Sequence, residues 1–255
     1  MGNMKEIKWE VKFGIILIIL IFVIYGIDYI IFGDFHDIFH YVMLHLGFIP
    51  IDILIVTLVI DKVMDNHEQK TLQEKIDILM GSFFSGIGNG LISKFYYANG
   101  EINLTKELKS IETWKEKDYE NALNELDENP ISFNFKLSSE DRTKFFIDLK
   151  EYLNERRPYL FDLIENPTLH QTDNFSELLL AMMHLTDELS YRKTFENLPE
   201  SDYVHLSYDI SRVYSKLIYE WVRYLEYTYK NYPYMLKLAV RINPFNENAS
   251  IYVKE

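Results

Sequence analysis

Five side chains in the C-terminal half of the chain have the types and the spacing to bind a divalent metal ion. His184 and Glu188 lie four residues apart, which places both on one face of a helix. Asp202, His205 and Asp209 share a face of the next predicted helix, and the spacing of the first two resembles half of a carboxylate di-metal motif. If the two helices form an antiparallel hairpin, two imidazoles and two or three carboxylates converge on one ion.

The same side chains are also typical of a solvated helix face. The second helix continues the polar stripe with three cations, Arg212, Lys216 and Arg223. Arg192, near the end of the first helix, and Arg212 are both placed to form ion pairs with the acids. A solvated or salt-bridged cluster is therefore the alternative to a metal site, and the sequence alone leaves both open.

Another carboxylate lies in apolar surroundings. Asp52 falls within the apolar run 41–60, and a carboxylate inside a membrane segment costs about 2.5 kcal/mol or more unless it is paired, hydrated or neutralised. If several subunits placed Asp52 around an axis, the ring would attract cations, and Asp34 and Asp37 would concentrate them at the outer entrance. The alternative is that Asp52 caps a half-helix begun at Pro50, where water reaches it.

No other reaction chemistry is indicated. The chain has no cysteine, which excludes disulfides, zinc-thiolate sites and thiol catalysis. Nucleophile motifs and a P-loop are absent from the sequence, so we predict no enzymatic activity and no cofactor other than the divalent metal. Residues 86–90 read Gly-Ile-Gly-Asn-Gly, but no predicted strand precedes them, so they indicate a flexible or closely packed helix segment instead of a phosphate loop.

Two apolar runs near the N-terminus determine where in the cell the protein is expected to reside. Residues 13–32 and 41–60 are each long enough, as helices, to span roughly 30 Å of hydrocarbon. A cleaved signal peptide is the alternative for the first run, because Lys5, Lys8 and Lys12 precede it. No small-residue cleavage site follows the run, which favours an uncleaved anchor.

Lysine placement predicts the orientation of this pair. The loop at residues 33–40 contains no lysine or arginine. Lysines flank the other ends of the two runs, at Lys5, Lys8 and Lys12 on one side and at Lys62, Lys70 and Lys75 on the other. Because positive residues concentrate on the cytoplasmic side, we expect both termini to be cytoplasmic and the loop to face outward.

Pro50 interrupts the second run. Proline removes a backbone donor and crowds the preceding turn, so a kink or a break is expected there. Either one bent helix crosses from about residue 39 to residue 60, or residues 37–47 lie at the outer surface and the crossing helix starts near Phe48. Asp52 lies near the midplane in the first geometry and near the outer mouth in the second.

Downstream of the runs, an apolar stripe continues at helical spacing through Leu72, Ile76, Leu79, Phe83 and Ile87. This stripe can pack on its own chain or on the same stripe of a neighbouring subunit. The next residues, 96–137, are polar and rich in charge. We expect them to be the least packed part, a charged linker or peripheral helices that end in a short extended segment at 131–137.

From residue 138 the helical signals strengthen. Ser138 or Ser139 begins a helix that is expected to end near Pro158, and a shorter helix follows to Ile164. Further helices are predicted at residues 177–192, 202–230 and 233–240, and the apolar centre 178–183 is expected to be buried. These elements together predict a helical bundle.

The amino-acid composition and the net charge of the chain limit the kinds of partner that it can bind. The 255 residues carry 26 Lys and Arg against 39 Asp and Glu, a formal net charge of −13, which argues against a nucleic-acid partner. Hydrophobic residues make up 48% of the chain and aromatic residues 15%, as expected for a folded protein.

We therefore predict an all-α protein, a two-helix transmembrane hairpin followed by a cytoplasmic helical bundle. The expected parts are a cytoplasmic N-terminus at residues 1–12, the hairpin at 13–62, a membrane-proximal amphipathic helix at 63–95, the linker or peripheral helices at 96–137 and the bundle at 138–255. The predicted function is to anchor a cytoplasmic interaction or sensing domain in the cell membrane, with the lipid bilayer, a further copy of the chain and an unidentified cytoplasmic protein as partners. The alternatives are a homo-oligomeric cation channel lined by the second membrane helix and a membrane-tethered metal-binding protein.

Overall fold

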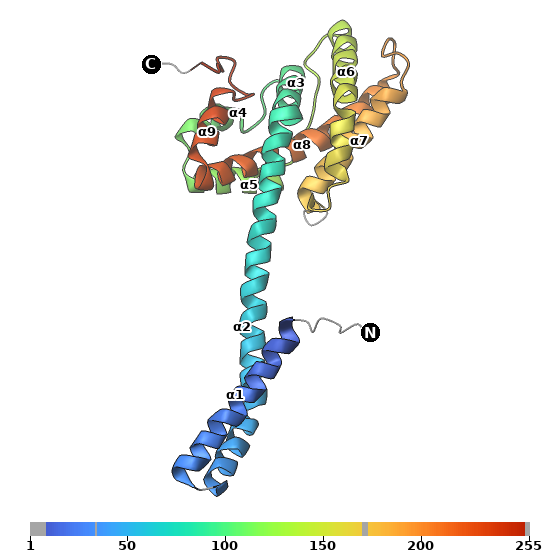
Figure 1. The fold of residues 1–255 in the computed structure, drawn as a ribbon. Helices are drawn as coiled ribbons and strands as arrows, with labels where there is room; N and C mark the ends of the chain where they lie inside the picture. The colour runs from blue at the N-terminus through green and yellow to red at the C-terminus, as the bar shows by residue number, and fades with distance from the viewer. Residues whose placement is uncertain (1–8, 34, 170–172, 253–255) are drawn as a thin grey trace, which may run out of the picture. The chain divides into compact units, whose positions relative to one another are not determined.

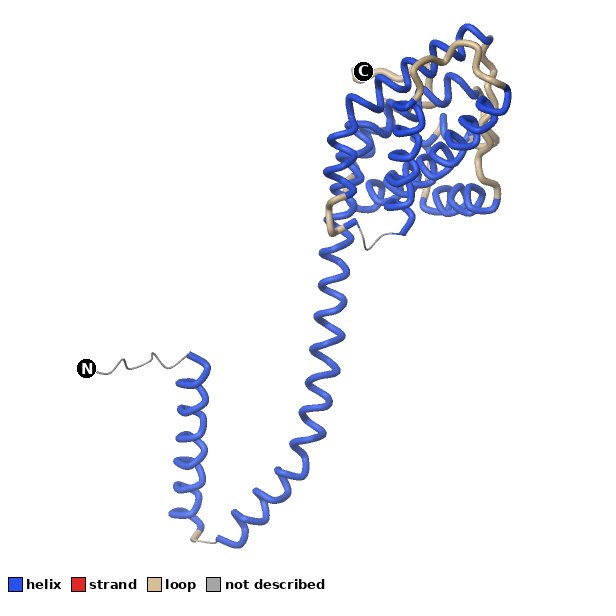
Figure 2. Tube along the Cα trace, turned by 90° about the vertical axis from the view of Figure 1, so that its right-hand side faces the viewer, coloured by secondary structure: helices blue, strands red, loops and turns tan. Residues whose placement is uncertain are grey.

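The computed structural model describes residues 9–33, 35–169 and 173–252. Every regular element in these ranges is a helix and none is a strand, which confirms the predicted all-α class (Figure 1, Figure 2). The chain divides into two compact units, residues 1–69 and 70–255. Helix α2 begins in the first unit and ends in the second.

The first unit consists of α1 (Trp9–Phe32) and the first part of α2 (Phe35–Phe83). Gly33 ends α1 with a positive φ of 68°, and its N–H donates to the carbonyl oxygen of Tyr29 at 2.9 Å. Because glycine adopts this conformation without strain, it is well suited to the turn between the two helices.

Helix α2 continues through Pro50 without a break. Of the two geometries left open, the single helix through Pro50 is therefore the one present, and the alternative of a separate helix that starts near Phe48 is excluded. Proline lacks the backbone N–H that would donate to the carbonyl oxygen four residues earlier, so only one hydrogen bond of α2 is lost at Pro50. The strongly apolar turns on both sides of Pro50 remain helical.

In the second unit, the predicted apolar stripe at the end of α2 packs on its own chain. Ile76, Phe83 and Ile87 are buried in the core of this unit. Between α2 and α3 (Asn89–Asn99) lies one π-helical turn, η1 (Phe84–Gly88), which shifts the helical register.

Residues 96–137 form helices, the expected alternative to a charged linker, but the expectation that they are the least packed part is wrong. They form α4 (Thr105–Lys109), the short helix η2 (Ile111–Thr113) and α5 (Glu116–Glu128). Tyr119, Ala122 and Leu126 are buried on the face of α5 that packs on α8. Three apolar positions at helical spacing are enough to dock α5, and the many charged residues lie on its other face.

The extended segment at 131–137 is not a strand, because its backbone pairs with side chains of helices. The N–H of Ile131 donates to Ser215 Oγ at 3.2 Å, and the N–H of Phe133 donates to Ser211 Oγ at 2.8 Å. The two serines lie one turn apart on α8, and the two backbone donors lie two residues apart, so the segment runs along that helix.

Helices α6 to α9 form the rest of the second unit (Figure 1). They span Ser139–Ile164 (α6), Asp173–Tyr191 (α7), Glu200–Asn231 (α8) and Pro233–Arg241 (α9). The predicted end of a helix at Pro158 is wrong, because Leu153, Leu160 and Leu163 are all buried and so continue the packed face of α6 past the proline. Within the apolar centre of α7, Leu180 is 59% exposed, so that stretch is not buried on all sides as predicted.

The core of the second unit runs from Ile76 to Phe245. Trp221 of α8 is buried at its centre, where its Nε1 donates to Asn89 Oδ1 at 3.1 Å and its ring lies 5.4 Å from that of Phe245. The predicted boundary at residue 138 therefore does not separate two parts, because α3 to α5 share one core with α6 to α9.

Candidate metal centre

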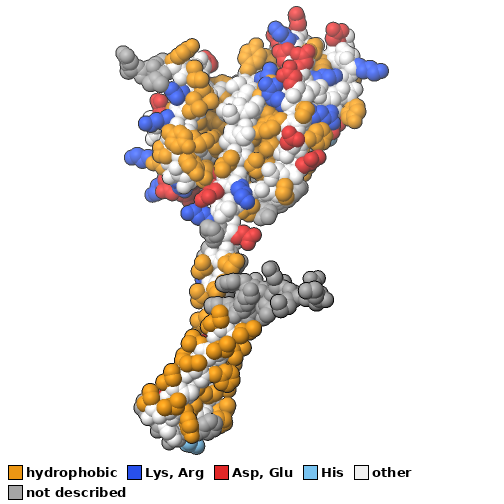
Figure 3. Space-filling model, in the orientation of Figure 1, with side chains coloured by type: hydrophobic (Ala, Val, Ile, Leu, Met, Phe, Trp, Pro, Cys, Tyr) orange, Lys and Arg blue, Asp and Glu red, His pale blue; other side chains and the backbone are white. Residues whose placement is uncertain are grey.

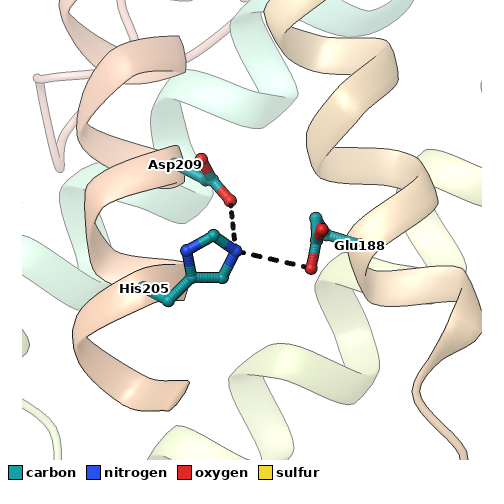
Figure 4. A group of neighbouring side chains, drawn as sticks. All are labelled: Glu188, His205 and Asp209. Atoms are coloured by element: carbon teal, nitrogen blue, oxygen red, sulfur yellow. Dashed lines mark ion pairs between the residues drawn. The ribbon is translucent and has the colours of Figure 1, made fainter. Parts of the chain in front are cut away.

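Two histidines and two acids of α7 and α8 come together as the spacing predicts. His205 Nε2 lies 3.4 Å from Asp209 Oδ2 and 3.6 Å from Glu188 Oε2 (Figure 4). His184 Nε2 lies 3.6 Å from the same Asp209 oxygen. We call these four residues the α7–α8 cluster.

The packing of the two helices explains this arrangement. On α7, His184 and Glu188 are each followed by a fully buried leucine, Leu185 and Leu189, and on α8 His205 and Asp209 are followed by Leu206 and Ile210. The buried side chains hold α7 and α8 together, and the residue before each of them lies at the edge of the contact. Four polar groups at matching edge positions therefore face one another.

Asp209 has the most unusual environment in the cluster. Its side chain is only 3% exposed, and its Oδ2 accepts no hydrogen bond from any described residue. Its other oxygen, Oδ1, lies 3.8 Å from Arg212 Nη1. Buried carboxylates normally have a hydrogen-bond or metal partner, because desolvation of an unpaired charge is costly.

The spacing of the nitrogen and oxygen atoms suits a metal ion better than hydrogen bonds. Good hydrogen bonds to nitrogen are roughly 2.7–3.2 Å long, and the three distances in the cluster exceed this range. Ligand atoms about 2.1 Å from a tetrahedral metal ion are separated by about 3.4 Å. The ligand atoms of Glu188, His205 and Asp209 all lie within 4.8 Å of one another, whereas His184 is not part of this group. His184 and His205 are 48% and 49% exposed, so two imidazoles reach solvent above a buried carboxylate.

Asp202 is not part of this cluster, although the sequence includes it in the predicted metal set. Arg192 donates to both oxygens of Asp202, from Nε at 3.1 Å and from Nη2 at 2.8 Å, and its Nη1 donates to Glu188 Oε2 at 2.6 Å. These hydrogen bonds lower the pKa values of Asp202 and Glu188. The salt-bridged alternative therefore applies to Asp202, which binds Arg192. Glu188 contacts both Arg192 and His205.

Of the acids predicted for an ion pathway, the two that the structure describes, Asp37 and Asp52, lie far apart along α2. Asp34 lies outside the described residues. Asp37 is in the first turn of α2, and Asp52 is exposed on the same helix. Fifteen residues separate Asp37 from Asp52, roughly 22 Å along a helix axis.

The glycine-rich segment has a packing role. Tyr152 of α6 donates from its hydroxyl to the carbonyl oxygen of Ile87 at 2.7 Å, and a Cβ at Gly90 would collide with that hydroxyl. This arrangement matches the closely packed helix segment that the sequence predicts.

One candidate residue was missed by the sequence interpretation. Glu220 of α8 is completely buried, and its Oε2 accepts no hydrogen bond from the described residues. The available signal was an acid at a position where the helical spacing calls for an apolar side chain, between the buried Leu217 and Tyr224.

Comparisons with known proteins agree on one family. The family models described as "MJ1433, N-terminal helical domain" and "Uncharacterized protein MJ1433, C-terminal helical domain" match residues 4–64 and 72–241. A protein of Methanocaldococcus jannaschii, "Uncharacterized protein MJ1433", is 37% identical over 253 residues, which cover 99% of each chain. No solved structure matches the chain. The chain therefore belongs to the MJ1433 family, whose two helical domains correspond to the two compact units.

Proposed function

We propose that this protein is a membrane-anchored metal-binding protein whose C-terminal domain binds one divalent transition-metal ion at the α7–α8 cluster. The observation that supports this most strongly is the buried Asp209 Oδ2, which accepts no hydrogen bond from the described residues, together with the close approach of Asp209, His205 and Glu188, whose ligand atoms all lie within 4.8 Å of one another. A bound cation would neutralise the buried carboxylate of Asp209 and use the imidazole of His205 and the carboxylate of Glu188 as further ligands.

The ligand types limit which metal fits. Imidazole nitrogens favour zinc, iron, nickel or copper, whereas magnesium and calcium prefer sites made of oxygen atoms alone. Glu188, His205 and Asp209 are the inner ligands, because their ligand atoms all lie within 4.8 Å of one another. Arg192 holds Glu188, and His184, 3.6 Å from Asp209 Oδ2, is placed to orient that carboxylate. When bound, the ion supplies a Lewis-acidic centre with positions open to solvent, an arrangement that suits a domain that senses or exchanges metal.

The membrane anchor is supported by composition and by exposed apolar surface. One continuous helical stretch of the described chain, residues 36–99, which comprises α2, η1 and α3, is long and apolar enough to cross a membrane, with a mean hydropathy of 2.3 over its most apolar window. The apolar helix Ile15–Ile31 is shorter. Large hydrophobic side chains are exposed along residues 15–31 and 39–64, and many of them gather on the face that Figure 3 shows. The lysine pattern supports cytoplasmic termini.

The cation-channel alternative remains a prediction, because it needs a ring of Asp52 side chains from several copies. Cation flux into liposomes that contain the purified protein tests it. Asp52→Asn should change the selectivity of that flux if the channel exists, and liposomes no leakier than empty ones would remove this alternative.

Metal content tests the proposed function. The full-length protein, purified in detergent and loaded with zinc, should retain about one equivalent after desalting. Asp209→Asn and His205→Ala should each lose most of it, because each removes an inner ligand. Asp202→Asn is the matched control on the same helix and should retain the metal. A wild-type content below about one-tenth equivalent under the same conditions would contradict the proposal.

A further inference from the structure

A separate cavity lies one helical turn beyond the α7–α8 cluster on α8. It has a volume of about 310 Å³ and is bounded by the end of α5, the start of α7 and the middle of α8. Leu126, Pro130 and Tyr219 provide its apolar wall. Its charged residues are two cations and two acids, Arg212, Lys216, Asp127 and Glu220. Pockets of this kind, apolar with a few convergent polar groups, are the usual form of small-molecule sites.

Glu220 is the unusual group in this cavity. It is completely buried, its Oε1 lies 3.3 Å from Arg223 Nη1, and its Oε2 has no hydrogen-bond donor among the described residues. Burial raises its pKa from 4.5 to about 6. A buried carboxylate oxygen on a cavity wall without a donor is matched by a ligand that brings one.

Arg212 provides the opposite charge at the same cavity. Its side chain is 43% exposed, and the guanidinium lies 5.1 Å from the centre of the Tyr208 ring. Within the described chain its nearest carboxylate oxygen, Asp209 Oδ1, is 3.8 Å away, too far for a hydrogen bond. Lys216, in contrast, is held by Glu177 at 2.5 Å. Arg212 therefore has donors available for the acidic group of a ligand.

We propose that this cavity binds a small zwitterion of the amino-acid class, whose ammonium group donates to Glu220 and whose carboxylate accepts from Arg212. The carboxylates of Glu220 and Asp127 would repel a simple anion, and Arg212 and Lys216 would repel a simple cation. A zwitterion satisfies both ends at once, and the apolar wall contacts its side chain. The volume, near the lower limit for ligand pockets, restricts the ligand to a small molecule.

This site goes beyond the proposed metal function and does not depend on it. Thermal unfolding of the full-length protein in detergent is measured with each of the twenty amino acids, in the presence of EDTA so that metal binding has no influence. At least one amino acid should raise the midpoint, and its affinity is then measured by calorimetry. Its two half-analogues, the amine without the carboxylate and the acid without the amine, should bind at least about tenfold more weakly.

Two variants assign the binding to this cavity. Glu220→Gln keeps the shape of the side chain but removes its charge, and Arg212→Gln removes the guanidinium, so each should weaken binding about tenfold or more. Glu226→Gln, on α8 and outside the cavity lining, is the matched control and should bind as the wild type does. The proposal is overturned if no amino acid raises the midpoint of the wild type, if the amine alone binds equally well, or if both cavity variants retain full affinity.

Discussion

Arg192 joins the last turn of α7 to the first turn of α8 through two hydrogen bonds to Asp202, at 3.1 and 2.8 Å. Arg192 is 17% exposed and Asp202 is 29% exposed, so water screens this pair only partly. The same guanidinium also binds Glu188, so one arginine fixes two acids from two helices at the edge of the α7–α8 cluster.

Removing this arginine should destabilise the C-terminal domain. Arg192→Leu leaves Asp202 and Glu188 without their main partner, and we expect a loss of about 1–2 kcal/mol in the free energy of unfolding, measured by denaturant titration. Lys230→Gln removes a more exposed ion pair, with Glu116 and Glu226, and should cost less than about 0.5 kcal/mol. Equal losses in the two variants would contradict this account.

Glu220 should make the domain less stable as the pH rises. Its pKa is about 6 in the folded protein and near the ordinary 4.5 when unfolded, so the folded state holds the proton more tightly. The resulting stability is present below about pH 4.5 and is lost as the pH rises through about 6, with a total change of about 2 kcal/mol. Glu220→Gln should remove this loss and raise the unfolding midpoint at pH 8. A variant with the same pH profile as the wild type would contradict the prediction.

Gly90 and Tyr152 should show energetic coupling. Gly90→Ala places a methyl group against the Tyr152 hydroxyl, so it should destabilise the domain even though alanine favours helix over glycine by about 1 kcal/mol. Tyr152→Phe loses the hydrogen bond to Ile87 and should cost about 1 kcal/mol. In the Tyr152→Phe background, Gly90→Ala should be less harmful, because the hydroxyl is gone. Additive effects in a double-mutant cycle would show that the close contact has no energetic role.

The membrane topology can be tested by cysteine labelling, because the natural chain has no cysteine to give background. Asp37 and Ser201 are both exposed and belong to different units. With a membrane-impermeant maleimide, Asp37→Cys should react in intact cells, whereas Ser201→Cys should react only after permeabilisation. Labelling of both in intact cells, or of Ser201→Cys alone, would contradict the proposed orientation.

Local spacing predicted much of the fold and part of the site. The helices at 177–192 and 202–230 are both present, and their i and i+4 polar positions do converge at His184, Glu188, His205 and Asp209. Spacing could not show that Asp202 lies outside the cluster. Asp202 binds Arg192 instead, and that contact depends on how far the long Arg192 side chain reaches toward α8. Charge content also misled the interpretation of residues 96–137, because a few buried side chains, such as Tyr119, outweigh many exposed charges in docking a short helix.

The cavity at Glu220 could not be predicted from the sequence. Its walls come from three helices that are separated along the chain, and a single acid within an apolar pattern does not indicate what surrounds it. Pro158 is similar, since only the packing of Leu160 and Leu163 shows that α6 continues past it.

Visible absorption of the full-length protein titrated with cobalt(II) tests the central claim most directly. If Glu188, His205 and Asp209 bind one metal ion, the first equivalent should produce the intense bands of four- or five-coordinate cobalt. Zinc should displace these bands, Asp209→Asn should abolish them, and Asp202→Asn should leave them unchanged. Only the weak bands of six-coordinate cobalt, identical in the wild type and in Asp209→Asn, would contradict the claim that the α7–α8 cluster is a metal site.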